Sequence, residues 1–172
     1  MTVYAGDATC TKPISGNPQN LIYGSCQVTY AYGGPKAMVA NYSGDETYGF
    51  SSSQVWSHHV NRYATTTTLT STNPAPALQP LTFNIAVAGT GAPALPTGNA
   101  RLTFENGLEF DVPVKNGMGQ YVMQNPQPGT QTVHVDYQGD GYYEPSQATI
   151  TQTVNCPTIN IGPDTLAAGT VM

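Results

Sequence analysis

Apolar and polar residues alternate with a period of two through much of the chain, and this pattern limits the possible folds more than any other feature. Residues 81–87, LTFNIAV, would form a strand with apolar side chains on one face and polar or small ones on the other. Residues 102–104 and 108–114 repeat the pattern, with a strong two-residue hairpin signal, Asn106-Gly107, between them. No segment has a helical period with caps, so we predict essentially no helix.

Further short strands follow as far as Asn155. In the last of them Gln152 interrupts the apolar face, which makes this strand the weakest match. If the Thr run at 65–70 opens the unit, about seven strands fit into about 90 residues, which predicts an all-β fold, an immunoglobulin-like β-sandwich. The predicted inner face comprises Leu81, Phe83, Ile85, Val87, Leu102, Phe104, Leu108, Phe110, Val112, Val114, Tyr121, Met123, Val133, Val135, Tyr137, Ala148, Ile150 and Val154.

The motif Tyr-x-Gly-Asp-x-x-Tyr occurs twice, at 42–48 and 137–143, and the two copies are 95 positions apart. The same offset places Val55 on Ile150, and Tyr4 would correspond to Phe104. Such repetition predicts modules in tandem, the first of them incomplete. Residues 1–62 would be the second half of a module (strands three to seven), residues 63–155 a complete module, and residues 156–172 the first strand of a further module or a donor-strand tail.

The repeated motif has a structural and a functional interpretation. In the structural one, Tyr42 and Tyr137 pack at the edge of the sandwich, Gly44 and Gly139 allow a positive φ, and Asp45 and Asp140 accept backbone N–H groups inside a turn. In the functional one, the acids bind calcium at a module junction. Calcium needs six or more oxygen ligands, and no further acid cluster accompanies the motif, so the sequence favours the structural turn.

Composition excludes several classes of partner. Charged residues make up 9% of the chain, and five scattered basic residues with a net charge of -5 form no phosphate-binding stripe, so we expect no nucleic acid partner. The apolar runs are too short to span a bilayer as a helix. The first residues lack the features of a signal peptide, and both ends have the look of cuts through a longer protein.

Two segments of the chain resemble a known family. The segments TTTTLTSTNPAPALQPLTFNIAV and YQGDGYYEPSQATITQTV are similar to the bacterial Ig-like repeat of large tandem-array surface proteins. The resemblance covers residues 64–155 and, as half a repeat, residues 1–62, while CPTINIGPDTLAAGTV resembles the opening of a different Ig-like module. The resemblance implies an extracellular or cell-surface location in stalks or adhesive filaments, but it implies no ligand.

Three cysteines are present. Members of the resembled family often carry a pair at the places of Cys10 and Cys26, so the resemblance implies a disulfide between them. Cys156 is left over, either as a free thiol or with a partner beyond this sequence. No Cys or His spacing is typical of zinc sites.

Residues for catalysis are scarce. His58 and His59 are adjacent on a predicted strand and would point to opposite faces, and His134 would lie on an outer face. No nucleophile, base and orienting group can be assembled, so we expect neither an enzyme nor a cofactor. Trp56 and Tyr63 could form a platform for sugar stacking, or they could pack the junction between modules.

Two functions from different classes remain. The first is a structural stalk or filament segment, favoured by the short linker at 61–64. The second is an adhesin module that binds a glycan or a surface protein through exposed loops such as 88–99, although the Ala, Gly and Pro content of that loop favours the first.

The stalk interpretation includes self-association. An incomplete first module would leave apolar residues exposed to solvent and strand edges unpaired. It would therefore need strands from upstream sequence or from another chain. The tail offers a candidate donor strand, with possible subunit contacts at Ile159, Ile161 and Leu166.

Overall fold

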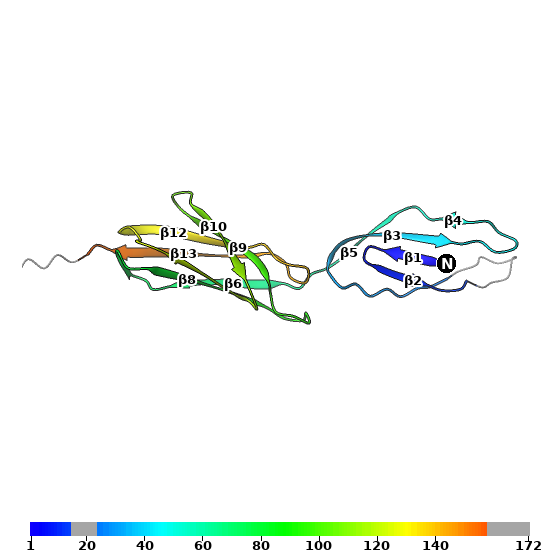
Figure 1. The fold of residues 1–172 in the computed structure, drawn as a ribbon, viewed down its shortest axis with the longest axis horizontal. Coiled ribbons are helices and arrows are strands. Elements are labelled where there is room, and N and C mark those ends of the chain that lie inside the picture. The colour runs from blue at the N-terminus through cyan, green and yellow to red at the C-terminus, as the bar shows by residue number, and fades with distance from the viewer. Residues whose placement is uncertain (15–23, 158–172) are drawn as a thin grey trace, which may run out of the picture.

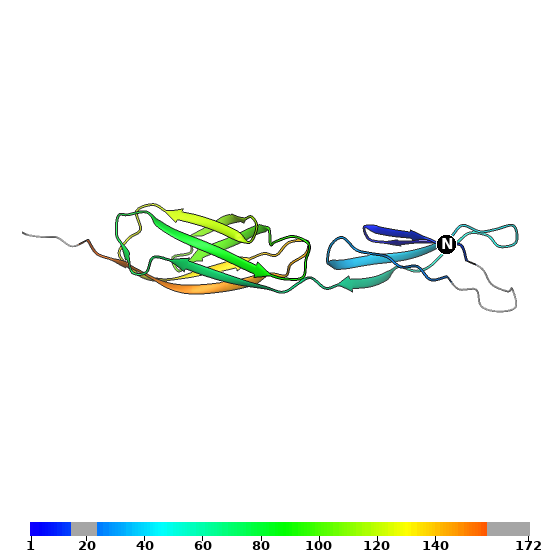
Figure 2. The same ribbon diagram turned by 90° about the horizontal axis from the view of Figure 1, so that it is seen from below.

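The computed structural model describes residues 1–14 and 24–157 and arranges them as two elongated lobes, one beyond the other (Figures 1 and 2). The described residues contain strands and no helix, as the sequence predicts. The first lobe contains β1 (Thr2–Ala5), β2 (Ala8–Thr11), β3 (Gly34–Tyr42), β4 (Ser51–Ser52) and β5 (Trp56–Val60). The second contains β6 (Thr65–Ser71), β7 (Ala75–Pro76), β8 (Leu81–Gly89), β9 (Gly98–Phe104), β10 (Glu109–Val114), β11 (Met118–Met123), β12 (Gly129–Tyr137) and β13 (Ser146–Asn155).

The second lobe is a β-sandwich with a closed apolar core. One sheet has the order β10-β9-β12-β13-β7 and the other the order β11-β8-β6. Every second residue of β8 from Leu81 to Val87 is buried, so the period-two prediction is confirmed there. Phe83 and Phe104 meet edge to face between the sheets, with ring centroids 5.5 Å apart. The predicted all-β immunoglobulin-like sandwich is therefore present.

A hairpin is present at Asn106-Gly107 as predicted, but its loop has the three residues 105–107 where the sequence indicated two, because Phe104 bonds Leu108. It joins β9 to β10, which pair in antiparallel register. Gly107 has a φ of 83°, and the Asn106 Oδ1 accepts the Leu108 N–H at 3.1 Å. A residue with a side chain adopts this backbone conformation only at a cost, which explains the glycine.

Two details of the core differ from the sequence prediction. Leu108 is 50% exposed, because it lies beside the hairpin at the start of an edge strand, where the opposite sheet no longer covers it. Gln152 does not weaken β13, since it is fully buried with its amide satisfied. Its Nε2 donates to the Thr72 carbonyl at 3.0 Å, and its Oε1 accepts from the Ser71 hydroxyl.

The opening strand of the second lobe changes sheet, which the sequence does not show. β6 pairs with β8 in antiparallel register, and after a short turn β7 pairs with β13 in parallel register. This short extra strand accounts for the difference between the seven strands expected and the eight in the structure. It places Ala75 in the core.

The first lobe repeats one sheet of the second. β2, β1 and β3 follow the order of β10, β9 and β12, and β4 and β5 together take the place of β13 beside β3. Gly34 and Gly129 begin the equivalent strands with positive φ, and Tyr42 and Tyr137 end them, so the offset of 95 applies to this strand.

Two equivalences inferred from the sequence are wrong by one residue. Ala5 pairs with Met38 as Phe104 pairs with Val133, so Ala5, not Tyr4, takes the place of Phe104. This explains why Tyr4 is 49% exposed while Ala5 is fully buried.

The second error concerns the last strand of the first lobe. Trp56 pairs with Met38, whereas Ile150 pairs with Val133, so Trp56, not Val55, is the counterpart of Ile150. The break between β4 and β5 holds one additional residue, which shifts the register.

Candidate functional site

The turn after β12 is organised by one carboxylate. The Asp140 Oδ1 accepts the N–H groups of Tyr142 and Tyr143, each at 2.8 Å. Its Oδ2 accepts the N–H and the hydroxyl of Thr97 at 2.9 and 3.0 Å. Burial works against ionisation, but these hydrogen bonds outweigh it and hold the pKa of Asp140 below 3.8. Asp140 therefore ties the turn to the strand entry before β9.

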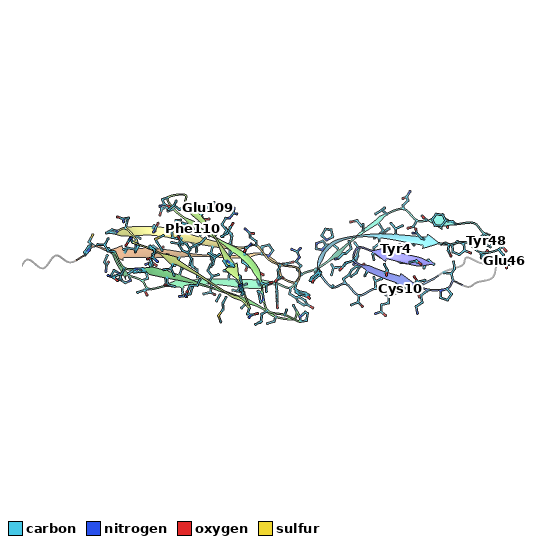
Figure 3. The ribbon with its side chains drawn as sticks, in the orientation of Figure 1. Tyr4, Cys10, Glu46, Tyr48, Glu109 and Phe110 are labelled. Carbon is cyan, nitrogen blue, oxygen red and sulfur yellow. A yellow bond between two sulfur atoms is a disulfide. The ribbon has the colours of Figure 1, made fainter. Side chains whose placement is uncertain are left out.

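The turn after β3 has the same internal bonds but fewer outside ties. The Asp45 Oδ1 accepts the N–H groups of Thr47 and Tyr48, each at 2.8 Å, while Oδ2 accepts the Tyr42 hydroxyl. The hydrogen bond from Tyr42 is the main cause of a lowered pKa for Asp45. Figure 3 places Glu46 and Tyr48 of this turn at the free end of the first lobe.

The two motif tyrosines have different environments. Tyr137 is 1% exposed, so it lies in the core and not at the sandwich edge where the sequence interpretation put it. Its hydroxyl donates to the Thr97 carbonyl at 2.6 Å, and burial together with the nearby Asp140 carboxylate raises the pKa of Tyr137 to about 12. Tyr42 is half-buried and bonds within its own turn. Gly44 and Gly139 have φ values of 86° and 78°.

The described residues hold no cluster of three or more potential metal ligands. The oxygens of Asp45 accept hydrogen bonds from its own turn, and those of Asp140 accept them from its turn and from Thr97. The geometry therefore gives the calcium interpretation of the motif no support.

A disulfide joins Cys10 on β2 to Cys26, with an S–S distance of 1.97 Å, as the family resemblance implies. In the second lobe the same place holds an aromatic pair. Phe110 lies opposite Leu102 as Cys10 lies opposite Val3, and its ring stacks on Tyr121 with centroids 4.5 Å apart. Cys156 is exposed and free among the described residues.

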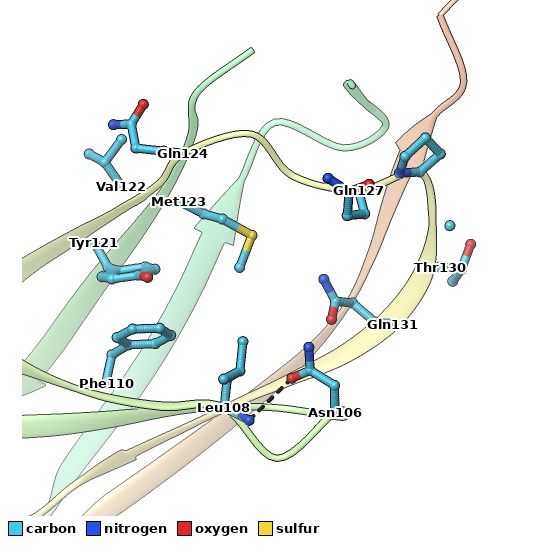
Figure 4. Close-up of a pocket in the computed structure, with 12 residues that line it drawn as sticks. Asn106, Leu108, Phe110, Tyr121, Val122, Met123, Gln124, Gln127, Thr130 and Gln131 are labelled. Carbon is cyan, nitrogen blue, oxygen red and sulfur yellow. Dashed lines mark hydrogen bonds between the residues drawn. The ribbon is translucent and has the colours of Figure 1, made fainter. Parts of the chain in front are cut away.

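The aromatic pair forms one wall of a groove of about 540 Å³ at the open edge of the sandwich (Figure 4). The groove lies between β10 and β11, each of which is the last strand of its sheet. Leu108, Val122 and Met123 add apolar surface. The rim carries the side-chain amides of Asn106, Gln124, Gln127 and Gln131.

One backbone hydrogen bond joins the first lobe to the second, and two more hold the linker against the second lobe. The Gly33 N–H of the first lobe donates to the Gly141 carbonyl, in the turn of the second lobe, at 2.9 Å. Tyr63 of the linker donates to the Tyr142 carbonyl at 2.8 Å and accepts the Glu144 N–H at 2.9 Å. The ring of Tyr32 also packs on that of Tyr142, with centroids 5.2 Å apart.

The loop proposed as a binding loop, 88–99, lies against this junction. The Tyr143 hydroxyl donates to the Ala94 carbonyl at 2.9 Å, and a Cβ at Gly91 would meet the Tyr63 ring at 2.6 Å. The loop thus contacts Tyr63 and Tyr143 at the junction. Tyr63 packs here as one interpretation expected, but Trp56 does not, since it lies on the sheet of the first lobe.

The histidines form no common site. His58 and His59 occupy successive positions of β5; the His58 ring stacks near Tyr30 with centroids 6.1 Å apart, and His59 lies 3.4 Å from the Asn61 Oδ1. His134 bonds Thr149 and Asp136 across the outer face.

The outward acids have partners of their own. Glu109 and Asp111 form ion pairs with Arg101, and Glu105 accepts the Thr132 N–H.

Sequence reasoning missed the groove and the role of Tyr142. The groove depends on two strand edges that only the fold brings together, whereas the YY pair at the end of the repeated motif was a usable signal for the junction. The proposed subunit contacts Ile159, Ile161 and Leu166 lie outside the described residues.

Comparison with known proteins gives one family. A family model for the bacterial Ig-like domain (group 3) matches residues 66–155, and no curated protein matches the chain. Among the described residues, no helix has the length and apolar character needed to cross a membrane. The matched region spans β6 to β13, the closed sandwich of the second lobe, and covers more than half of the chain. The chain belongs to the bacterial Ig-like domain family, group 3.

Proposed function

We propose that the chain is a structural stalk segment of a bacterial surface or extracellular protein, with residues 1–62 and 63–155 as successive modules. The junction carries this proposal. Its three backbone hydrogen bonds and the Tyr32–Tyr142 contact leave the linker at 61–64 little freedom, and a fixed linker favours a semi-rigid rod. The disulfide is consistent with an oxidising, extracellular location.

The position of the two Asp turns supports the same proposal. Both turns follow the equivalent strand, so each lies at the same end of its lobe. In the second lobe this end contacts the preceding lobe, and Tyr143 is 1% exposed there. In the first lobe the corresponding end has no such contact among the described residues, with Tyr48 48% and Phe50 68% exposed. A further module could dock on this end as the first lobe docks on the second.

Small-angle X-ray scattering of the full chain tests the stalk proposal. A variant with Gly-Gly-Ser inserted between Asn61 and Arg62 would break the register of the junction bonds while leaving both lobes intact. We expect the original chain to scatter as one extended particle and the variant as a broad ensemble. Equal flexibility in the two chains would refute the stalk.

The edge groove supports a second candidate function, that of an adhesin module for a glycan. Apolar ring faces with side-chain amides at the rim suit a sugar, which has both apolar faces and hydroxyl groups. A glycan-array screen would test it. Gln131→Ala on the rim should abolish any binding, whereas Gln120→Ala, at a glutamine of β11 that does not line the groove, should not. Binding that survives Gln131→Ala would rule out the groove.

A further inference from the structure

The first lobe has only one sheet among its described residues, whereas the second lobe has two. In the second lobe, β6 and β8 complete the second sheet, and β11 pairs with β8. The first lobe has a counterpart of β11 in residues 24–32, which run along the lobe to the junction (Figure 1). It has no described counterpart of β6 or β8.

Residues 24–32 behave as a strand without a partner. Cys26, Val28 and Tyr30 are half-buried, while the residues between them are exposed, which is the alternation of a strand against a sheet. They belong to no strand ladder among the described residues. The segment is held instead by the disulfide, by the Tyr30–His58 stack and by the Gly33–Gly141 bond. Among the described residues its backbone edge therefore has no strand partner.

The β5 side of the sheet below this segment is uncovered among the described residues. Trp56 faces the same side as Met38 and Ala5, because the three are cross-strand partners. It is nevertheless 72% exposed, although its counterpart Ile150 packs against the core of the second lobe. His58 is exposed where its counterpart Gln152 is fully buried.

The second lobe shows what covers these positions. β6 lies over β13, where Thr67 bonds Ser146 and Ser71 bonds Gln152. β8 pairs with β11 from Met118↔Ala86 to Met123↔Leu81 and buries its own alternate residues in the core. The same two strands, placed on the first lobe, would cover Trp56 and His58 and pair with the backbone of residues 24–32.

We propose that the first lobe is an acceptor for a pair of antiparallel strands of the β6–β8 type, supplied by another Ig-like module segment. The strand beside residues 24–32 would present apolar side chains at alternate positions. The other would cover Trp56 and place a hydroxyl or amide group near His58, as Ser71 lies near Gln152. This inference rests on the proposed function, since it names the partner with which the stalk continues.

The chain carries its own probe, because Trp56 is its single tryptophan. Ala5 takes the place of Phe104, so equivalent residues of β1 and β9 differ by 99 in number. Met1 therefore takes the place of Ala100. A copy of residues 65–99 placed directly before Met1 would thus offer the strand pair with the connection it has in the second lobe. The matched control carries the same copy with Asp at the positions of Phe83 and Ile85.

Acrylamide quenching of Trp56 and hydrogen exchange of the amides of residues 25–32 are the two measurements. With the copy we expect a blue-shifted emission, a loss of quenching and slower exchange of these amides. The control should match the unmodified chain, with an exposed indole and fast exchange.

Equal quenching and equal exchange with the copy and with the control would overturn the proposal. So would shielding of Trp56 in the unmodified chain that grows with its concentration, because a second copy would then cover the face. Neither result changes the scattering comparison at the junction, so failure of this inference is distinguishable from failure of the stalk.

Discussion

Asp140 accepts four hydrogen bonds with its two carboxylate oxygens, two from its own turn and two from Thr97. Asp140→Asn would keep the turn bonds, but it would place an amide NH₂ opposite the Thr97 N–H, two donors facing each other. We expect the second lobe to lose roughly 1–3 kcal/mol of unfolding free energy in chemical denaturation.

The same substitution should change the pH dependence of stability. The pKa of Asp140 is lowered in the folded protein, below the 3.8 of the free side chain. Its contribution is therefore complete above 3.8 and is lost as the pH falls through the lower folded value. Asp140→Asn should flatten this acid limb. An unchanged dependence of stability on pH below 3.8 in Asp140→Asn would contradict the assignment.

Phe110 and Tyr121 stand where the first lobe has its disulfide. If this equivalence of backbone positions is correct, Phe110→Cys combined with Tyr121→Cys should form a disulfide under oxidising conditions. Peptide mapping without reductant would detect it. Recovery of both new thiols in free form would show that the two lobes differ in backbone at this edge.

At the scale of the element, β8 is the centre of its sheet and holds Phe83 fully buried against Phe104. Phe83→Ala should cost roughly 3–5 kcal/mol of unfolding free energy, because it leaves a cavity in a closed core. Leu95→Ala, at a position 57% exposed, is the matched control and should change stability little. A loss below about 1 kcal/mol for Phe83→Ala would mean that the strand register is wrong.

Residues 24–32 depend on the disulfide more than a paired strand would, since they have no ladder among the described residues. Cys10→Ser with Cys26→Ser should lower the stability of the first lobe by roughly 3 kcal/mol, as expected for a loop of this size. The amides of 24–32 should exchange faster in this variant. Unchanged exchange in that segment would show that packing alone holds it.

The elements of the second lobe were predictable because burial on one face imposes a period of two, which β8 and β9 display clearly. In short strands the alternation is a weaker guide to which face is buried. In residues 2–5, Val3 and Ala5 lie on one face of the strand and Tyr4 on the other, so either face could be the buried one. The large Tyr4 favoured the wrong face. Gln152 looked like a defect because its partner Ser71 is 81 residues away.

Among the candidate sites, too, local features were predictable from the sequence and long-range contacts were not. Asp45 and Asp140 were predictable because a turn is local in sequence. The edge groove and the junction were not, since each joins strands or lobes whose contact is set by the fold. The exposure of Trp56 was equally hidden, because it depends on which strands pack over β5, and that is not local in the sequence.

At the scale of the whole molecule, the account depends on the junction. Figure 1 shows the lobes in line, with the turn of the second lobe meeting the linker of the first. Tyr63 bonds on both sides to that turn, through Tyr142 and Glu144, and its ring lies 6.2 Å from that of Tyr143. Together with the Gly33–Gly141 bond and the Tyr32–Tyr142 contact, these contacts are expected to restrict the bend and the rotation between the lobes.

Residual dipolar couplings of backbone amides in the full chain test this most directly, because they report the orientation of each lobe in one weakly aligned sample. The account predicts that β3 and β12 fit a single alignment tensor of one magnitude. Two tensors of different magnitude, or couplings that average towards zero in the first lobe, would show lobes that move independently and would contradict a stalk with a fixed junction.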